Sequence, residues 1–169
     1  LDSNGWYYVS DANSPIGQAG VLRVDSSRWD NLIHQTFYPA SGGMQGHIMR
    51  RYRKAGTWEG WEWVNPPMAA GVEYRTTERS SGSPVYAKKI SATFSASNAG
   101  GTSLVKTPHG ISGFNYLVDF FGKMGKTLLP TMWGDTYISL YQVDETNISF
   151  YVKDRAFSGG CTFILRYTK

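Results

Sequence analysis

Three runs of the sequence place apolar side chains at every second position. They cover residues 90–95, 147–153 and 161–168. A period of two is typical of half-buried antiparallel strands, whereas an amphipathic helix repeats every 3.6 residues. No stretch longer than about ten residues shows the helical period. Since 19 glycines and 7 prolines punctuate the runs, the sequence predicts an all-β fold.

A pair of prolines divides the chain. Pro66 and Pro67 disfavour both helix and central strand, so we expect a short, stiff connector over residues 67–71. Before it, five expected strands (near 5–10, 21–24, 33–37, 46–53 and 58–64) make a small β-rich domain of residues 1–66. After it, seven expected strands (72–79, 85–90, 103–107, 116–122, 137–143, 147–153 and 161–167) match the strand density of an antiparallel β-sandwich over residues 72–169.

Charge and cysteine content exclude several classes of partner. The 17 basic and 13 acidic side chains give a net charge of +4 that is scattered along the chain, so no nucleic-acid partner is expected. Cys161 is the sole cysteine, which excludes an intrachain disulfide and a cysteine-based metal site. Its alternating apolar surroundings predict a small buried hydrophobe. No apolar run reaches the length of a membrane span, so membrane insertion is not expected. The opening Leu1-Asp2 suggests the C-terminal part of a longer protein.

Three tryptophans in six residues, Trp58, Trp61 and Trp63, mark a hairpin. A tight turn at Gly56 would fold residues 48–53 back onto an aromatic strand over 58–64. Tryptophan rings can stack on sugars, but they are also buried on average in protein cores. This average burial favours core packing for Trp58 and Trp61, so we expect this hairpin to close a small core and not to form the binding platform.

Loops rich in aromatic and short polar residues are the better candidates for a binding site. The predicted ligand-binding residues are Trp133, Asp135, Tyr137, Asn115, Tyr116 and Trp29. The first three lie in the loop 129–137, and the next two lie in a second loop after Gly113. An equally weighted alternative is that these loops form a subunit interface, which enriches the same residue types. Trp29 alternatively caps the small core.

Catalytic and metal-binding patterns are missing from the sequence. No His-x-His or His-x-x-x-His spacing occurs among the three histidines, and no metal or other cofactor is expected. Glycoside hydrolysis needs a pair of carboxylates, but Asp119 has no identifiable partner and Asp144 sits in an expected turn. Neither a nucleophile elbow nor a phosphate-binding loop is present. We therefore expect no catalytic residues.

Residues 1–66 resemble the pyocin knob family, small β-rich modules in the fibres of R-type pyocins and tailed phages. The matching elements, in order, are Gly5-Trp6-Tyr7-Tyr8, Gly20-Val21-Leu22-Arg23-Val24, Gln35-Thr36-Phe37, Arg50-Arg51-Tyr52 and Gly56-Thr57-Trp58-Glu59-Gly60-Trp61. The remainder looks like a C-terminal domain common at the ends of phage tail proteins. Its matching elements are residues 73–79, 82–86, 109–111, 129–130, 146–148 and 165–169.

The resemblance implies a function. Such chains form homotrimeric fibre tips or receptor-binding proteins at the tail of a virion, with a β-sandwich head. The implied partners are a bacterial surface glycan or wall polymer and the upstream fibre shaft or baseplate proteins. Two alternatives stay open: a non-catalytic fragment of a tailspike depolymerase, and a purely structural tip that trimerises the fibre.

Overall fold

The computed structural model describes residues 1–27, 32–97, 102–133, 136–153 and 156–169. Apart from one short 3-10 helix, η1 (Asp11–Asn13), its regular elements are strands, and most of them pair antiparallel. The expected all-β fold is thus confirmed. The chain forms two compact units. The first contains Leu1–Pro67 with Tyr74–Glu78, and the second contains Met68–Glu73 with Arg79–Lys169.

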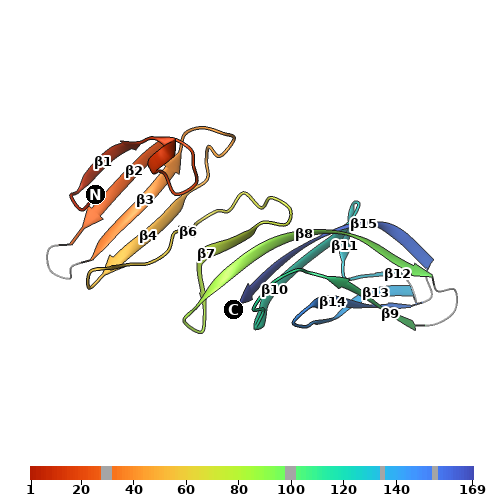
Figure 1. Ribbon diagram of the computed structural model, residues 1–169. Helices are drawn as coiled ribbons and strands as arrows, with labels where there is room; N and C mark the ends of the chain where they lie inside the picture. Colours follow the sequence, from red (N-terminus) through yellow and green to blue (C-terminus); the bar gives the residue numbers. More distant parts are fainter. Residues whose placement is uncertain (28–31, 98–101, 134–135, 154–155) are drawn as a thin grey trace. The chain divides into compact units, whose positions relative to one another are not determined.

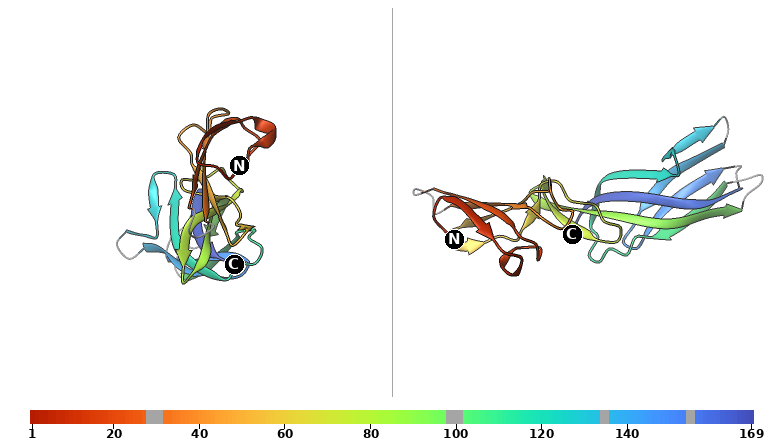
Figure 2. Two further views of the ribbon diagram at one scale, coloured as in Figure 1. Left: turned by 90° about the vertical axis from the view of Figure 1, so that its left-hand side faces the viewer. Right: turned by 90° about the horizontal axis from the view of Figure 1, so that it is seen from above.

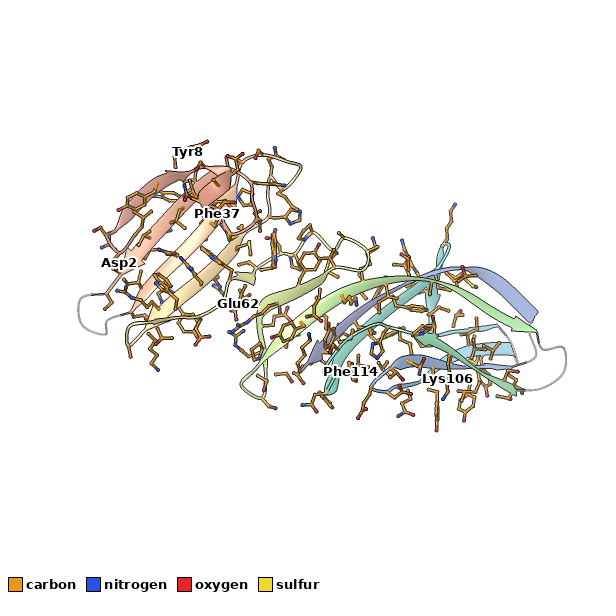
Figure 3. All side chains as sticks on the ribbon, in the orientation of Figure 1. Asp2, Tyr8, Phe37, Glu62, Lys106 and Phe114 are labelled. Atoms are coloured by element: carbon orange, nitrogen blue, oxygen red, sulfur yellow. The ribbon has the colours of Figure 1, made fainter. Side chains whose placement is uncertain are left out.

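The first unit is built on one twisted sheet (Figure 1). Its strands are ordered β1 (Gly5–Val9), β2 (Gly20–Ser26), β3 (Ile33–Pro39), β4 (Met49–Lys54) and β6 (Glu62–Trp63), and β5 (Thr57–Trp58) also pairs with β4. Every second residue is buried from Gly20 to Val24 of β2 and from Ile33 to Pro39 of β3, as expected for half-buried strands. Phe37, labelled in Figure 3, is fully buried at the centre of this face.

The tryptophan hairpin differs from the expected continuous strand. Its turn is as predicted: Ala55 and Gly56 have φ of 50° and 85°, the positive values that a type I′ turn requires. Arg53 pairs with Trp58, so regular pairing would oppose Arg50 to residue 61, yet Arg50 pairs with Glu62. One extra residue is therefore accommodated between β5 and β6, as in a β-bulge, and the ladder is interrupted over residues 59–61.

This interruption separates the three tryptophans. Trp63 is buried, as expected for the core, whereas Trp58 and Trp61 are only half-buried. The expected core packing of Trp58 and Trp61 is therefore met only in part: the ring of Trp61 lies edge-on to that of buried Phe37, with centroids 6.4 Å apart. For Trp61, the physical reason is that the extra residue takes it out of the regular strand alternation.

One segment of the predicted sandwich domain groups with the first unit. In β7 (Glu73–Ser80), Thr76 pairs in parallel with Trp63, and the ring of Tyr74 lies edge-on to that of Trp63 with centroids 5.7 Å apart. Glu62 is buried, and Arg75 Nε binds its Oε1 at 2.9 Å. The main division between the units thus falls between Pro67 and Met68, within the expected connector, but Tyr74–Glu78 finds its partners in the first unit.

The second unit contains two antiparallel sheets, seen as two layers in Figures 1 and 2. One has the order β8 (Ser83–Ser97), β15 (Ala156–Thr168), β10 (Tyr116–Met124) and β11 (Thr127–Leu129). The other has the order β12 (Thr131–Trp133), β13 (Thr136–Val143), β14 (Asn147–Lys153) and β9 (Thr102–Pro108). Phe150 and Phe163 stack across the layers with ring centroids 5.4 Å apart. This core makes the unit a β-sandwich.

Cys161 lies in the same core, as its sequence context predicts. The side chain is 3% exposed, and burial raises the pKa of its thiol. The thiol therefore stays protonated and acts as a small apolar group in the packing of β15.

Candidate functional site

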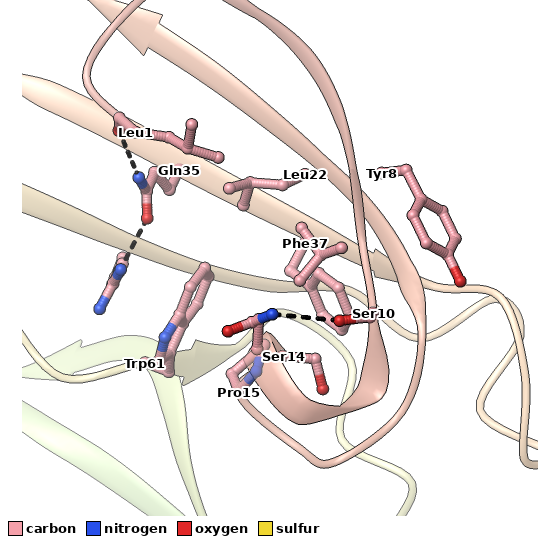
Figure 4. Close-up of a pocket in the computed structure, with 12 residues that line it drawn as sticks. Leu1, Tyr8, Ser10, Ser14, Pro15, Leu22, Gln35, Phe37 and Trp61 are labelled. Carbon is pink, nitrogen blue, oxygen red and sulfur yellow. Dashed lines mark hydrogen bonds between the residues drawn. The ribbon is translucent and has the colours of Figure 1, made fainter.

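A cavity of about 620 Å³ lies in the first unit (Figure 4). Leu22 of β2 and Phe37 of β3 provide apolar walls. Trp61, released from the strand ladder, provides an aromatic one. The lining residues with polar groups in their side chains include Tyr8, Ser10, Asn13, Ser14, Gln35 and Arg51. A concave site with aromatic walls and a few convergent polar groups is the usual form of a small-molecule or sugar-binding site.

Gln35 is the buried polar residue that organises one end of the cavity. It takes an inward position on β3 between Ile33 and Phe37 and is 1% exposed. Its Nε2 donates to the carbonyl oxygen of Leu1 at 2.8 Å, and its Oε1 accepts from Arg51 Nε at 2.9 Å. Both ends of the amide are thereby satisfied, as burial requires. The bond to Oε1 also fixes the orientation of the Arg51 guanidinium.

Arg51 is held between two indole rings. Its guanidinium carbon lies 4.3 Å from the ring centroid of Trp58 and 4.6 Å from that of Trp61. Both distances fall within the range of favourable cation–π contact. Burial lowers the pKa of Arg51 from its usual value, but an arginine remains charged at neutral pH. The stacking and the bond to Gln35 therefore hold a positive charge in one fixed plane at the cavity wall.

The connection between β1 and β2 supplies the hydroxyl and amide groups opposite. Asn13 Nδ2 donates to Ser10 Oγ at 3.1 Å, and Ser14 Oγ accepts from the backbone of Gln18 at 2.8 Å. These local bonds shape the loop around η1. No aspartate or glutamate is among the described residues that line the cavity. The described lining therefore has donors and acceptors for a polar ligand.

The loop residues predicted as ligand contacts occupy separate places. Trp29 and Asp135 lie outside the described residues, and for Trp133 only the backbone is described, as the last residue of β12. Tyr137, the second residue of β13, pairs with Met132 and lines a depression of about 470 Å³. Asn115 instead lines a depression of about 580 Å³ with the turn after β13. Tyr137 and Asn115 thus lie near opposite ends of β13, and the structure does not bring them together.

The second depression is lined by a turn with a structural role. Asp144 Oδ1 accepts from the backbone nitrogens of Thr146 and Asn147 at 2.9 and 2.7 Å. These bonds hold the pKa of the Asp144 carboxyl below its usual value. Of the two loop residues predicted here, Asn115 is exposed, and Tyr116 is 63% exposed on β10. Both side chains are accessible, and their role as ligand contacts stays a prediction.

His109 is buried behind this turn, 2% exposed, near Phe114 (labelled in Figure 3), with ring centroids 5.2 Å apart. Its Nδ1 accepts from the backbone nitrogen of Ile111 at 3.1 Å, so the proton resides on Nε2, which donates to the carbonyl oxygen of Asp144 at 2.9 Å. His109 is thus a core residue that ties the loop after β9 to the turn after β13.

Asp119 lies at a β-bulge of β10, where its carboxylate accepts from the backbone of Phe120 at 2.8 Å and faces Arg166 at 3.8 Å. Its side chain is 60% exposed. An exposed carboxylate with these partners has the features of a surface ion pair.

The described residues contain neither a metal-binding cluster nor a membrane-spanning helix. No group of three histidine, cysteine or acidic residues in this part of the chain is arranged to hold a metal ion. No helix there is long and apolar enough to cross a membrane.

The sequence did contain a signal for the cavity. An amide at an inward-facing position, Gln35 between Ile33 and Phe37, is a polar group in a core pattern and requires specific partners. Its partners, Arg51 and Leu1, were not identifiable because they come from other parts of the chain. The contribution of Trp61 depends on the extra residue between β5 and β6, which the local pattern does not show.

Comparisons with known proteins give similarities to pyocin fibres. No protein-family model matches the sequence, and no curated protein matches it. Among solved structures, an N-truncated R2-type pyocin tail fibre has 13% identity and a TM-score of 0.31, with 97% of this chain and 91% of that chain covered. The C-terminal part of a P. aeruginosa R1 pyocin fibre has 13% identity and a TM-score of 0.33, with 97% and 63% covered. At these values, the similarities decide neither the fold nor the site.

Proposed function

We propose that this chain is the distal part of a phage-type tail fibre or receptor-binding protein, which attaches to a bacterial surface glycan or wall polymer without catalysis. The ordered resemblance of residues 1–66 to pyocin knob modules supports the particle type. The observation that carries the binding role is the cavity, in which half-buried Trp61 and oriented Arg51 face hydroxyl and amide groups. We place the primary binding site there, and the loops around Asn115 and Tyr137 become secondary candidates.

Weak individual sites suit this role. A fibre tip that carries several copies of one module multiplies a modest affinity through effective concentration. The resemblance implies three copies per fibre. The partners are then the surface polymer and the upstream fibre shaft or baseplate proteins, and the chain acts at the tail tip of the particle.

A glycan array followed by calorimetry on the intact chain tests the proposal. We expect binding to a bacterial surface polysaccharide, weakened at least about tenfold by Trp61→Ala. Trp6→Ala is the matched control, because Trp6 belongs to the same unit, is 64% exposed and does not line the cavity. Tyr116→Ala tests the loop site. Loss of binding in Tyr116→Ala with full binding in Trp61→Ala would move the site to the second unit, and polymer shortening on incubation would contradict the non-catalytic role.

The second candidate function is structural: the chain would form the tip that holds the subunits of the fibre together. Val118 and Phe121 on β10 and Leu128 on β11 are 38%, 44% and 60% exposed. Exposed apolar side chains on neighbouring strands are suited to a contact between subunits. Sedimentation of Phe121→Ser and Leu128→Ser variants tests this candidate: loss of an oligomer would assign these strands to assembly, and a wild-type chain that binds no glycan would favour the structural tip over the receptor-binding role.

A further inference from the structure

We propose that the cavity of the first unit selects a saccharide that carries an anionic group, a carboxylate or a phosphate, and that Arg51 binds this group. The inference rests on the proposed function and names the ligand class for the same site. It is carried by the charge balance of the cavity, by the free donors of Arg51 and by the way its guanidinium is held.

The positive charge of Arg51 is not neutralised by the described residues. None of the side chains lining the cavity is acidic, and Arg51 forms no ion pair with any described residue. The neighbouring cations are paired differently: Arg53 Nη1 binds Asp2 at 2.9 Å, and Arg75 is within 3.6 Å of Glu59. A partly desolvated charge without a counter-ion attracts an anionic ligand more strongly than an exposed one.

The donors of Arg51 are available in a suitable geometry. Its Nε is used by Gln35, while the N–H groups of both Nη atoms have no hydrogen-bond acceptor among the described residues. A guanidinium is planar, and its fork of N–H groups matches two oxygens of a carboxylate or phosphate. A neutral sugar hydroxyl can use only part of this fork.

The guanidinium is oriented before any ligand arrives. Trp58 and Trp61 lie 4.3 and 4.6 Å from it, and Gln35 fixes its rotation within the plane. Ligand binding therefore costs little side-chain entropy. The adjacent Trp61 and the hydroxyls of Ser10 and Ser14 remain for the sugar ring and its hydroxyls.

Matched polysaccharides test the inference. The wild-type chain is applied to an array of bacterial surface polysaccharides, each in its native form and after carboxyl reduction or removal of phosphate. We expect every polysaccharide bound in a Trp61-dependent manner to carry an anionic group, and its neutralised form to bind about 10- to 100-fold more weakly. Loss on carboxyl reduction identifies a carboxylate, and loss on phosphate removal identifies a phosphate.

Substitutions distinguish specific binding of the anionic group by Arg51 from non-specific attraction to the positive charge of the protein. Arg51→Gln should abolish the difference between native and neutralised forms, and Arg51→Lys should retain only part of it. Arg23→Gln removes the same charge from an exposed position that pairs with Asp25 and does not line the cavity, so it should preserve the difference. Thermal unfolding checks that each variant is folded. If a variant is unfolded, the binding of the wild-type chain to native and neutralised polysaccharides still tests the inference.

The possible failures are distinct. Equal, Trp61-dependent binding of native and neutralised forms would overturn the anionic ligand and leave the proposed function in place. Polysaccharide binding of unchanged affinity in Trp61→Ala would overturn the cavity as the binding site. Absence of any binding on the array would contradict the proposed function and, with it, this inference.

Discussion

The hydroxyl of Tyr167 donates a hydrogen bond to Oε2 of Glu73, 94 residues earlier in the chain. The other carboxylate oxygen accepts from Lys169 Nζ at 2.6 Å. Both residues that bind Glu73 belong to the C-terminal end of the chain, and Tyr167 itself is fully buried between the sandwich sheets. The segment Met68–Glu73 is thereby fastened to β15 within the second unit.

Removing the Tyr167 hydroxyl should destabilise the second unit at neutral pH. Tyr167→Phe keeps the ring packing but leaves Glu73 with one partner fewer, so we expect a loss of about 1–3 kcal/mol in the free energy of unfolding. Urea unfolding at pH 7 measures it. Tyr141→Phe, at a position 53% exposed, is the control and should change stability by less than about 0.5 kcal/mol. Equal values for the two variants would contradict a structural role for the bond.

The same tyrosine predicts a loss of stability in alkali. Burial, and then the bond to Glu73, raise the pKa of Tyr167 well above its usual 10.0. Below pH 10 the phenol is protonated in both states, and its contribution is complete. Above pH 10 only the unfolded state releases the proton, so the free energy of unfolding should fall by about 1.4 kcal/mol per pH unit. Unfolding curves above pH 10 should show a shallower fall for Tyr167→Phe. If the free energy of unfolding fell equally with pH in the wild type and in Tyr167→Phe, ionisation of Tyr167 would be excluded as the cause.

The buried ion pair of the first unit should be strongly coupled. Glu62 is 4% exposed, and its Oε1 lies 2.9 Å from Arg75 Nε. A double-mutant cycle with Glu62→Gln and Arg75→Gln should give a coupling free energy of about 1–3 kcal/mol. The exposed pair Arg23–Asp25, with N···O also 2.9 Å, is the matched control and should couple by less than about 1 kcal/mol. Equal coupling in the two cycles would show that burial of Glu62 is irrelevant.

His109 should contribute to stability through its two hydrogen bonds. His109→Phe retains an aromatic ring but leaves the nitrogen of Ile111 and the carbonyl of Asp144 without their bonds to the imidazole. We expect a loss of about 1–3 kcal/mol, measured by urea unfolding. The same substitution at exposed His34 is the control and should have an effect below about 0.5 kcal/mol. A neutral outcome at His109 would show that water replaces both bonds.

Gly20 should not tolerate a methyl group. A Cβ there would lie 2.4 Å from the backbone oxygen of Tyr38 and 2.7 Å from the ring of Phe37, far below van der Waals contact. Gly20→Ala should therefore cost about 1–3 kcal/mol and lower the melting temperature. Gly160→Ala is the control, since a Cβ at that strand position meets nothing within 4 Å. A stable Gly20→Ala variant would mean that β2 and β3 can shift apart.

Prediction from sequence succeeded where the signal is local. The alternation in residues 147–153 and 161–168 corresponds to strands in β14 and β15, and Cys161 is buried as its neighbours indicate. The binding residues were harder to predict. The pattern around Trp61 favoured core packing, and the extra residue that turns it toward the cavity follows from pairing with β4.

The sequence by itself determined that this chain is all-β, because side-chain alternation and turn-forming glycines act over a few residues. Tertiary structure decided which strands meet. It placed Tyr74–Glu78 with the first unit and brought Gln35, Arg51 and Trp61 to one cavity. These outcomes depend on contacts between residues far apart in the chain, and such contacts are selected by packing and by the need to satisfy buried polar groups, which no local pattern records.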